Sequence, residues 1–593
     1  MKNQNIPVEF FSEIKSIKDF CFSKKDDYMF YVTNLGDFYR TWVVPSGGGY
    51  PIKVDILQEG DVANIKLSPD GEYLALSVDK EGREEFDIYI LPAEGGELRK
   101  LTDKIKLSFS DFDWSPDSRA LVGIGEMNGH YNVMMITTDT RRITWLTDTP
   151  DIKSDLDWSH DGRWIAYTSY ENQLQADICM VNIRTKEIKN LTDSLEGENT
   201  RPEFSPDNKC IAFTSDARGT KNVVIMELEN RSTLWISQKN EAEQQFLEWH
   251  PRGDHFTFLK NENGERTIYE TDYPPTKTRR ISTTGFYGSV VKYSHQGDKL
   301  AVLLNSPTRP SEIFIREAKT LRILTNSSVL GLPTGRMVTP ETVRYSSFDD
   351  EEISAFFYKP RESTKFPVVI KLHGGPAGQT CKGWDPLTQL LVSNGIGVFA
   401  PNVRGSSGYG SRFENEVFHD WGGKDLKDVV YAARFLKEDP FVDDKNIVVT
   451  GGSYGGYLTM MALAKYPDLW SCGINLFGPV NLKTLYGTSS TWLKVILEKK
   501  YGFKPPEEDE EFYKDRSPLN FIENINCPLL VVYGKNDPRV PINEVRQLRE
   551  KMVHSKKTFE EEILQNEGHS MKRNKNELFI MKRILDFIIR NVQ

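Results

Sequence analysis

A short phrase recurs seven times in the first half of the chain, and this repeat constrains the fold more than any other feature. Each copy has an aromatic or apolar residue, then Ser or His, then a turn rich in Pro, Asp and Gly, and then an apolar strand pattern. The copies begin at Phe22, Leu67, Trp114, Trp158, Phe204, Trp249 and Tyr293. Their spacing of about 45 residues is typical of a β-propeller, in which each repeat forms one blade of four strands.

A second recurring phrase supports the four-strand unit. It begins with Asp-Ile, continues as an apolar alternation and ends in Leu-Thr-Asp, as in residues 87–103 and 177–193. Seven such units close a ring, because each blade then buries its faces against its two neighbours. We therefore expect a seven-bladed, all-β propeller over roughly residues 15 to 325, and we interpret the aromatic residues of the first phrase as blade packing.

The second half of the chain has a different pattern. From about Val338, apolar strand patterns alternate with helical patterns, which predicts βαβ units and a mostly parallel sheet. An antiparallel pair is expected at 343–346 and 353–358, buried strands at 368–372, 397–400, 447–450, 472–476 and 529–533, and helices at 425–436 and 544–552. The predicted domains are residues 1–330 and 331–593, with the first ~15 residues free to pack on the second domain.

Composition narrows the class of protein. At 593 residues the chain is too long for one hydrophobic core, and its formal net charge of −10 argues against nucleic acid or an anionic membrane as a partner. The N-terminal residues lack the apolar core of a secretory signal, and no apolar run is long enough to span a bilayer, so we expect a cytoplasmic protein. Its six cysteines include no Cys-x-x-Cys pair, as expected for reduced thiols.

Residues 451–456, with the sequence Gly-Gly-Ser-Tyr-Gly-Gly, lie between a predicted strand and a predicted helix. In a Gly-x-Ser-x-Gly elbow, a sharp turn exposes the serine hydroxyl at the carboxyl edge of the sheet, and the glycines let strand and helix approach each other. The strand before the motif and the helix after it are the context that this chemistry needs. Ser453 is therefore the candidate nucleophile.

A nucleophilic serine needs a general base and a carboxylate that orients the base, and in this arrangement they follow in the order Ser, acid, His. Asp537 follows the predicted strand 529–533, and His569 follows the segment Glu562-Ile563-Leu564. Both side chains are thus expected just beyond strand ends, as Ser453 is. We assign His569 as the general base and Asp537 as the group that fixes its tautomer.

An oxyanion needs two fixed donors, usually the N–H after the nucleophile and one from the loop after an earlier strand. Tyr454 supplies the first, and Gly375, in the loop after the strand 368–372, is the expected second, because Pro376 has no N–H. Neither a His-Glu-x-x-His motif nor a clustered His/Asp pattern is apparent among the nine histidines, and no Gly-Lys-Ser/Thr of a phosphate-binding loop is present. We expect no metal and no cofactor.

With these motifs, the chain resembles the prolyl oligopeptidase family of serine peptidases over essentially its whole length, and within it the acylaminoacyl-peptidase branch. The resemblance is carried by residues 373–376, 402–410, 451–457, 537–541 and 567–569. It implies a seven-bladed propeller followed by an α/β-hydrolase domain. It also implies that the propeller limits the substrates to short peptides.

The resemblance further implies that Arg539 binds a substrate peptide carbonyl and that a hydrophobic pocket receives the first substrate side chain. Phe477, Tyr486 and Trp492 are candidates for this pocket, with packing inside the core as their alternative role. His373 stands where prolyl oligopeptidases and dipeptidyl peptidases carry a tyrosine oxyanion donor, and this departure favours the acylaminoacyl-peptidase branch.

We expect a serine peptidase that releases N-terminal residues, N-acylated or free, from short peptides through an acyl-enzyme. One alternative is a dipeptidyl peptidase or aminopeptidase, in which the pair Glu84-Glu85 would bind the substrate amine rather than form a solvated blade edge. A carboxylesterase could use the same triad. A propeller binding module with an inactive hydrolase domain would require a missing triad residue. Exposed propeller edges leave open the formation of a homo-oligomer.

Overall fold

The computed structural model describes residues 6–102, 107–172, 175–237, 242–328, 334–361 and 365–592. The chain divides into two compact units. The propeller unit comprises Lys15–Ser306 and Ser311–Ser327, and the hydrolase unit comprises Met1–Ile14, Pro307–Pro310 and Ser328–Gln593. The boundary expected at residue 330 falls in residues 329–333, outside the described residues. Within the described ranges, no helix is both long enough and apolar enough to cross a membrane.

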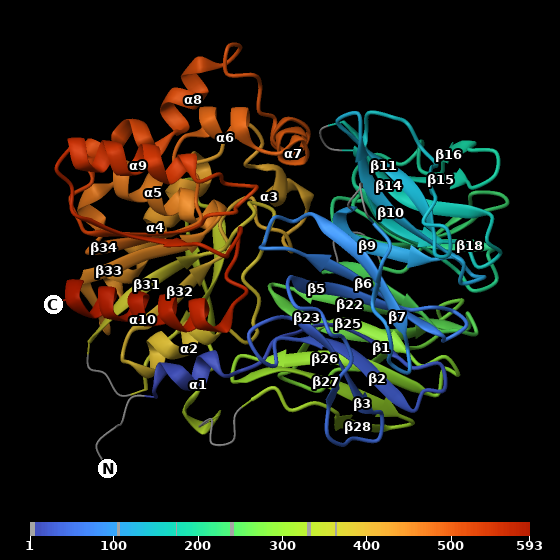
Figure 1. Cartoon of the computed structure of the whole chain (residues 1–593). Coiled ribbons are helices and arrows are strands. Elements are labelled where there is room, and N and C mark those ends of the chain that lie inside the picture. The colour runs from blue at the N-terminus through green and yellow to red at the C-terminus, as the bar shows by residue number, and fades with distance from the viewer. Residues whose placement is uncertain are drawn as a thin grey trace. The chain divides into compact units, whose positions relative to one another are not determined.

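The described strands of the propeller unit form seven antiparallel groups of four, each group being one blade (Figure 1). The first three blades are β1 (Ile17–Phe22), β2 (Tyr28–Thr33), β3 (Arg40–Pro45) and β4 (Ile52–Lys53); β5 (Asp61–Leu67), β6 (Tyr73–Asp79), β7 (Phe86–Pro92) and β8 (Arg99–Lys100); and β9 (Leu107–Trp114), β10 (Ala120–Met127), β11 (His130–Thr137) and β12 (Ile143–Trp145). Phe86 pairs with Leu107, which joins the second and third blades into one sheet.

The remaining four blades repeat this pattern. They are β13 (Ile152–Trp158), β14 (Trp164–Asn172), β15 (Gln175–Asn182) and β16 (Ile188–Asn190); β17 (Asn199–Phe204), β18 (Cys210–Ser215), β19 (Asn222–Glu227) and β20 (Thr233–Trp235); β21 (Glu243–Trp249), β22 (His255–Glu262), β23 (Glu265–Asp272) and β24 (Thr278–Arg280); and β25 (Tyr287–Tyr293), β26 (Lys299–Ser306), β27 (Arg309–Glu317) and β28 (Thr320–Ile323). The predicted seven-bladed propeller is confirmed.

The recurring Ser-Pro-Asp phrase forms the turn between the first two strands of a blade. In the third blade, the Ser115 hydroxyl bonds to Asp117 (2.6 Å) and accepts the N–H of Ala120 (2.9 Å). The same serine contacts recur in the second, fourth and fifth blades. A side chain that satisfies turn donors in this way explains why the phrase repeats. In the sixth blade His250 stands in the serine position.

The ring closes between the seventh and first blades. The N–H groups of His295 and Gln296 donate to the Asp26 carboxylate at 2.8 and 3.1 Å. The innermost strands of all seven blades line one central cavity of about 640 Å³. Charged side chains pair across its wall, including Lys66 with Asp113 (3.2 Å).

The hydrolase unit contains an eight-stranded sheet in the order β29-β30-β32-β31-β33-β34-β35-β36. Its strands are β29 (Glu341–Ser346), β30 (Glu352–Tyr358), β31 (Phe366–Leu372), β32 (Gly397–Pro401), β33 (Val442–Gly452), β34 (Cys472–Leu476), β35 (Leu529–Gly534) and β36 (Phe559–Leu564). The pairs β29·β30 and β30·β32 are antiparallel, and the other pairs are parallel. This arrangement confirms the predicted antiparallel opening followed by a parallel sheet.

Helices cover both faces of this sheet (Figure 1). They are α1 (Val8–Ser12), α2 (Pro386–Ser393), α3 (Ser411–Asn415), α4 (Lys424–Glu438), α5 (Tyr454–Lys465), α6 (Leu482–Thr488), α7 (Thr491–Tyr501), α8 (Glu510–Arg516), α9 (Asn543–His554) and α10 (Asn574–Asn591), with 3-10 turns at Thr334–Arg336, Pro467–Leu469 and Pro518–Asn524. Adjacent strand residues face opposite layers: Val449 packs with α4, α5 and α9, whereas Val448 packs with α2 and α10. A strand segment buried on both faces is expected to be apolar, as residues 447–449 of β33 are.

The N-terminal helix α1 belongs to the hydrolase unit, although it precedes the propeller in the sequence. Val8 and Phe11 are buried in a cluster with Leu390 of α2 and Met581 of α10. Lys582 also forms an ion pair with Glu9 (2.6 Å). The chain therefore begins and ends in the same compact unit.

Candidate active site

Ser453 lies in a sharp turn between β33 and α5. Its backbone has φ 55° and ψ −119°, a conformation that L-residues rarely adopt and that lifts the side chain out of the strand-to-helix corner. The corner is tight: a Cβ on Gly455 would lie 2.3 Å from the carbonyl oxygen of Leu372 at the end of β31. Only glycine fits at that position, because a side chain would overlap the neighbouring backbone.

The structure brings Ser453, His569 and Asp537 together from three loops at the carboxyl ends of parallel strands. His569 Nε2 lies 2.8 Å from Ser453 Oγ, and His569 Nδ1 lies 2.6 Å from Asp537 Oδ2. A carboxylate only accepts, so Nδ1 carries the hydrogen and Nε2 presents its lone pair to the serine hydroxyl. This is the hydrogen-bond order that a general base beside a nucleophile needs.

Asp537 is held in a fixed position and is shielded from water. Its side chain is 0% exposed, and that of His569 is 8% exposed. The second carboxylate oxygen, Oδ1, accepts the backbone N–H groups of Arg539 (2.8 Å) and Val540 (2.9 Å). The loop after β35 thus orients the carboxylate, and the carboxylate orients the imidazole.

The loop that carries His569 is anchored by Glu567, whose role the sequence analysis did not predict. Glu567 is 1% exposed and accepts the N–H groups of Lys572 (3.1 Å) and Arg573 (2.9 Å) and the side-chain amide of Asn576 (2.8 Å). Its carbonyl accepts the N–H of Asn536 from the Asp537 loop (3.0 Å). The only hint of this role in the sequence is that Glu567 lies two residues before His569.

Two backbone segments border the serine as candidate oxyanion donors. The N–H of Tyr454 belongs to the first turn of α5, where backbone N–H groups lack helical partners and the helix dipole favours negative charge. Gly374 lies beside the nucleophile, since a Cβ built on it would be 3.4 Å from Ser453 Cβ, and Gly375 follows it with φ +142°. His373 is hydrogen-bonded to this loop, with Nδ1 2.8 Å from the Gly374 carbonyl oxygen.

The four candidate substrate-binding residues occupy different surroundings. The ring of Phe477 lies 6.2 Å from that of His569, edge to face, and Phe477 itself has φ 56° directly after β34. The guanidinium of Arg539 lies over the Trp492 ring at 5.4 Å. Tyr486 is buried in the helical layer, where its hydroxyl donates to Glu498 and its ring contacts that of Tyr513, 6.1 Å away.

A buried carboxyl group beneath the nucleophile turn also escaped the sequence analysis. Asp425, at the start of α4, accepts a hydrogen bond from the Tyr454 hydroxyl and is 0% exposed. Burial, with a smaller contribution from the charge of Asp420, raises the pKa of Asp425 to about 7. An acidic residue in the first turn of a helix is common at exposed positions, so no local pattern indicates that Asp425 is buried.

The fold and this geometry define a class of protein: a serine hydrolase in which an α/β-hydrolase unit accompanies a β-propeller. Comparison with known proteins narrows the class. Residues 384–593 match the prolyl oligopeptidase family, and residues 124–342 match the TolB beta propeller domain. Residues 384–593 therefore form a prolyl oligopeptidase family domain, which supports a serine peptidase.

Similar proteins include an uncharacterized peptidase, YuxL, of Bacillus subtilis (strain 168), which is 27% identical over 562 residues, covering 82% of each chain. Dipeptidyl aminopeptidase BIII of Pseudoxanthomonas mexicana is 30% identical over 255 residues, which are 41% of this chain and 37% of that protein. Among solved structures, the acylaminoacyl peptidase of Pyrococcus horikoshii has a TM-score of 0.74 and 21% identity, covering 99% of this chain and 97% of that one. At this identity the structural likeness concerns the fold.

Proposed function

We propose that this peptidase releases N-terminal residues, preferentially N-acylated ones, from short peptides through an acyl-enzyme on Ser453. The observation that carries the proposal is the relay of hydrogen bonds from Asp537 through His569 to the Ser453 hydroxyl. The position of His373 in place of a tyrosine oxyanion donor favours the acylaminoacyl-peptidase branch over the dipeptidyl-peptidase branch.

In the first half-reaction, Ser453 Oγ attacks the carbonyl carbon of the scissile amide while His569 Nε2 takes the hydroxyl proton. The tetrahedral intermediate carries its negative charge on the former carbonyl oxygen, near the N–H groups assigned to Tyr454 and Gly375. His569 then returns the proton to the leaving nitrogen as the C–N bond breaks. Asp537 stabilises the imidazolium that forms between these two steps.

In the second half-reaction, water attacks the ester carbonyl of the acyl-enzyme and gives its proton to His569. Collapse of the second intermediate returns the proton to Ser453 Oγ and releases the acid. The proton that Ser453 loses leaves with the amine, and a proton from the attacking water replaces it, so the enzyme is regenerated.

The recognition roles are part of the same proposal. Arg539 would bind a substrate carbonyl, and its position over the Trp492 ring would limit the directions in which the guanidinium can point. Phe477, beside His569, would form one wall of the pocket for the first side chain. The buried hydrogen bond from Tyr486 to Glu498 favours the core-packing role for Tyr486 over direct substrate contact.

The test compares hydrolysis of the p-nitroanilides of acetyl-Phe, acetyl-Ala, free Phe and a free dipeptide, with Ser453→Ala as the control. We expect the acetylated substrates to be cleaved fastest and the control to fold but lose turnover. Preference for the free dipeptide would reject the acylaminoacyl assignment. Retention of a parental rate by Ser453→Ala would reject the mechanism as a whole.

A dipeptidyl aminopeptidase is the second candidate, because one similar protein carries that name. In that case the paired acids Glu84 and Glu85, which precede β7, would bind the substrate amine. Glu84→Gln and Glu85→Gln should then raise KM for the free dipeptide and leave acetylated substrates unaffected. Comparing peptides of increasing length separately tests the expected restriction to short substrates.

A further inference from the structure

Three potential metal-binding side chains meet in the sixth blade of the propeller, far along the sequence from the triad. His250 directly follows β21, whereas Asp254 and His255 lie at the start of β22. The sequence expectation that the histidines do not cluster with acidic residues is wrong at this turn. The pattern His-x-x-x-Asp-His was visible, but only the turn folds it into one site.

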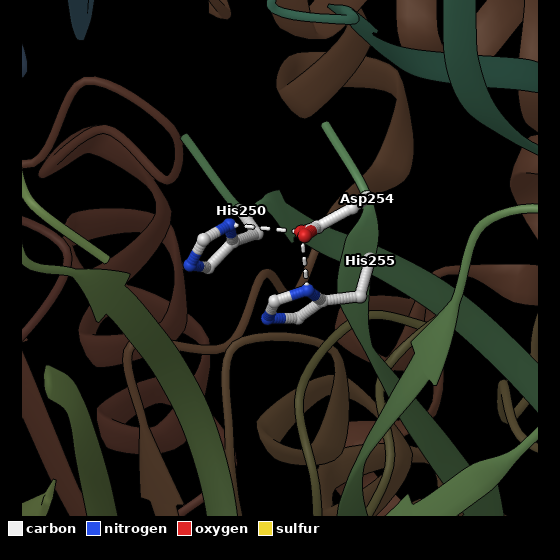
Figure 2. Close-up of side chains that lie close together, drawn as sticks. All are labelled: His250, Asp254 and His255. Atoms are coloured by element: carbon white, nitrogen blue, oxygen red, sulfur yellow. Dashed lines mark hydrogen bonds and ion pairs between the residues drawn. The ribbon is translucent and has the colours of Figure 1, made fainter. Parts of the chain in front are cut away.

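The ligand atoms face one another (Figure 2). Asp254 Oδ1 lies 3.2 Å from His250 Nδ1 and 2.6 Å from His255 Nδ1, and the three groups offer atoms that all lie within 4.8 Å of one another. The two imidazole rings stack with their centroids 3.9 Å apart, and both Nδ1 atoms face Asp254. Ligands bound tetrahedrally to Zn²⁺ at about 2.0–2.1 Å lie roughly 3.4 Å apart, so these atoms need only small shifts to bind one ion.

The hydrogen bonds of His250 place its lone pair on Nδ1, the ring nitrogen beside the Asp254 carboxylate. Nε2 lies 3.1 Å from the carbonyl oxygen of Gly297, which only accepts, so Nε2 carries the hydrogen. Nδ1 accepts the N–H of Arg252 at 3.2 Å and therefore carries the lone pair. That lone pair lies 3.2 Å from an oxygen of Asp254, which is also electron-rich. A cation between them would convert this repulsion into two coordinate bonds.

Both imidazoles have an acceptor beyond the ligand side of the ring, as metal-binding histidines usually do. For His250 it is the Gly297 carbonyl, and for His255 it is Glu270, whose Oε1 lies 3.7 Å from Nε2. Glu270 is itself fixed by the Tyr293 hydroxyl (3.0 Å) and by Arg316. The Gly297 carbonyl orients the His250 ring, and the hydrogen bond of Nδ1 to Asp254 orients the His255 ring.

We propose that His250, Asp254 and His255 bind one divalent transition-metal ion of the Zn²⁺ type, with water completing its coordination. Two imidazoles and one carboxylate suit Zn²⁺, Ni²⁺ or Cu²⁺ better than Ca²⁺ or Mg²⁺, which prefer oxygen ligands. The Asp254 side chain is 52% exposed, so water reaches the site, whereas that of His250 is fully buried. Binding replaces the hydrogen bond from Arg252 to His250 and the one from His255 Nδ1 to Asp254. The hydrogen on His255 Nδ1 then moves to Nε2, which faces Glu270, so that Nδ1 can bind the ion.

The ion has a structural role in this proposal. Gly297, Tyr293 and Arg316 belong to the seventh blade, whereas the three ligands belong to the sixth. A bound ion would fix the β21–β22 turn and, through these contacts, the packing between the two blades. A ligand that binds the folded state alone raises the thermal midpoint, so metal should stabilise the propeller unit.

The test uses the full chain, freed of metal by a chelator and then titrated with Zn²⁺ or Co²⁺. Equilibrium dialysis with metal analysis measures stoichiometry, Co²⁺ absorption reports the ligand set, and thermal unfolding reports stability. We expect one ion per chain at the site and a midpoint raised by a few degrees. Asp254→Asn and His255→Gln should each weaken binding at least ~10-fold, since even outer-shell changes cost that much.

Two further variants complete the design. His130→Gln removes an exposed propeller histidine outside the cluster and should bind metal like the parent. His250→Ser restores the residue that other blades carry at this turn, so it should fold yet lose the ion. If the parent binds no metal, or if Asp254→Asn and His255→Gln bind it as tightly as His130→Gln does, the cluster is an ordinary ion pair and the proposal is wrong.

Discussion

Asp425 allows a quantitative test of how burial shapes the electrostatics beside the candidate nucleophile. Its carboxyl group is buried and accepts a hydrogen bond from the hydroxyl of Tyr454, the residue after Ser453. Burial and the neighbouring charge of Asp420 raise the pKa of Asp425 from 3.8 to about 7 in the folded protein. In the unfolded chain this carboxyl is in water, so its pKa returns to the lower value.

The sign of the effect follows from which state holds the proton. Below about pH 4 both states are protonated; between about pH 4 and pH 7 the unfolded chain loses the proton while the folded protein keeps it. The free energy of unfolding therefore falls as pH rises through this window and levels off above it. About three pK units at ~1.4 kcal/mol each set an upper bound of about 4 kcal/mol on the loss.

The variant Asp425→Asn isolates this contribution, because the amide oxygen still accepts the Tyr454 hydroxyl but cannot ionise. Urea unfolding at pH values from about 4 to about 8 gives the free energy of unfolding of variant and parent. The two units can unfold separately, so the transition of the hydrolase unit must be followed on its own. We expect the variant to gain stability over the parent as pH rises from about 4 to about 7.

The control is Asp444→Asn, which makes the same chemical change at an exposed position of β33. Its stability curve should run parallel to that of the parent across the whole range. A parallel curve for Asp425→Asn as well would mean that Asp425 is ionised in the folded protein near pH 5, and the argument from burial would be refuted.

Three further predictions concern the site. Gly455→Ala should destabilise the protein by about 1–3 kcal/mol, because its Cβ would meet the Leu372 carbonyl at 2.3 Å, whereas Gly487→Ala, with nothing within 4 Å, should not; thermal unfolding compares them. Glu567→Gln keeps the shape of the side chain but weakens the hydrogen bonds that anchor the His569 loop, so kcat should fall while KM changes little. An unchanged kcat with a raised KM would contradict an effect on the catalytic geometry. Arg539→Ala should raise KM for peptide substrates more than for a small p-nitrophenyl ester, as steady-state kinetics with both substrates can show. An equal rise in KM for both would mean that Arg539 does not bind the peptide.

The sequence was informative wherever structure is local. The seven copies of the turn phrase predicted the blades, because each copy forms one hydrogen-bonded turn such as that at Ser115. The strand Cys472–Leu476 was predicted to the residue, since a strand buried on both faces is mostly apolar and Asn475 is its one polar residue. The strand predicted at 447–450 extends over Val442–Gly452, because Val442 pairs with Phe366 of β31 and Gly452 pairs with Leu476 of β34.

Contacts between distant segments were harder to predict. Tyr486 has the aromatic side chain that a hydrophobic substrate pocket needs. However, its packing against Tyr513 and its hydrogen bond to Glu498 place it in the core. Asp425 resembles an ordinary charged helix start, and its burial under Tyr454 depends on how α4 and α5 meet. In each case the role depends on a partner that lies elsewhere in the chain, so no local pattern could reveal it.

The candidate site owes its geometry to backbone contacts between strand ends more than to side-chain packing. A Cβ on Gly534, at the end of β35, would lie 1.9 Å from the carbonyl oxygen of Gly568, just before His569. Gly455 touches the end of β31 in the same way. Backbone in direct contact cannot shift without moving its neighbour, whereas side chains can adopt other rotamers. The loops that carry the nucleophile, the carboxylate and the base are thus fixed against one another by the sheet itself, which gives the preorganisation that acyl transfer requires.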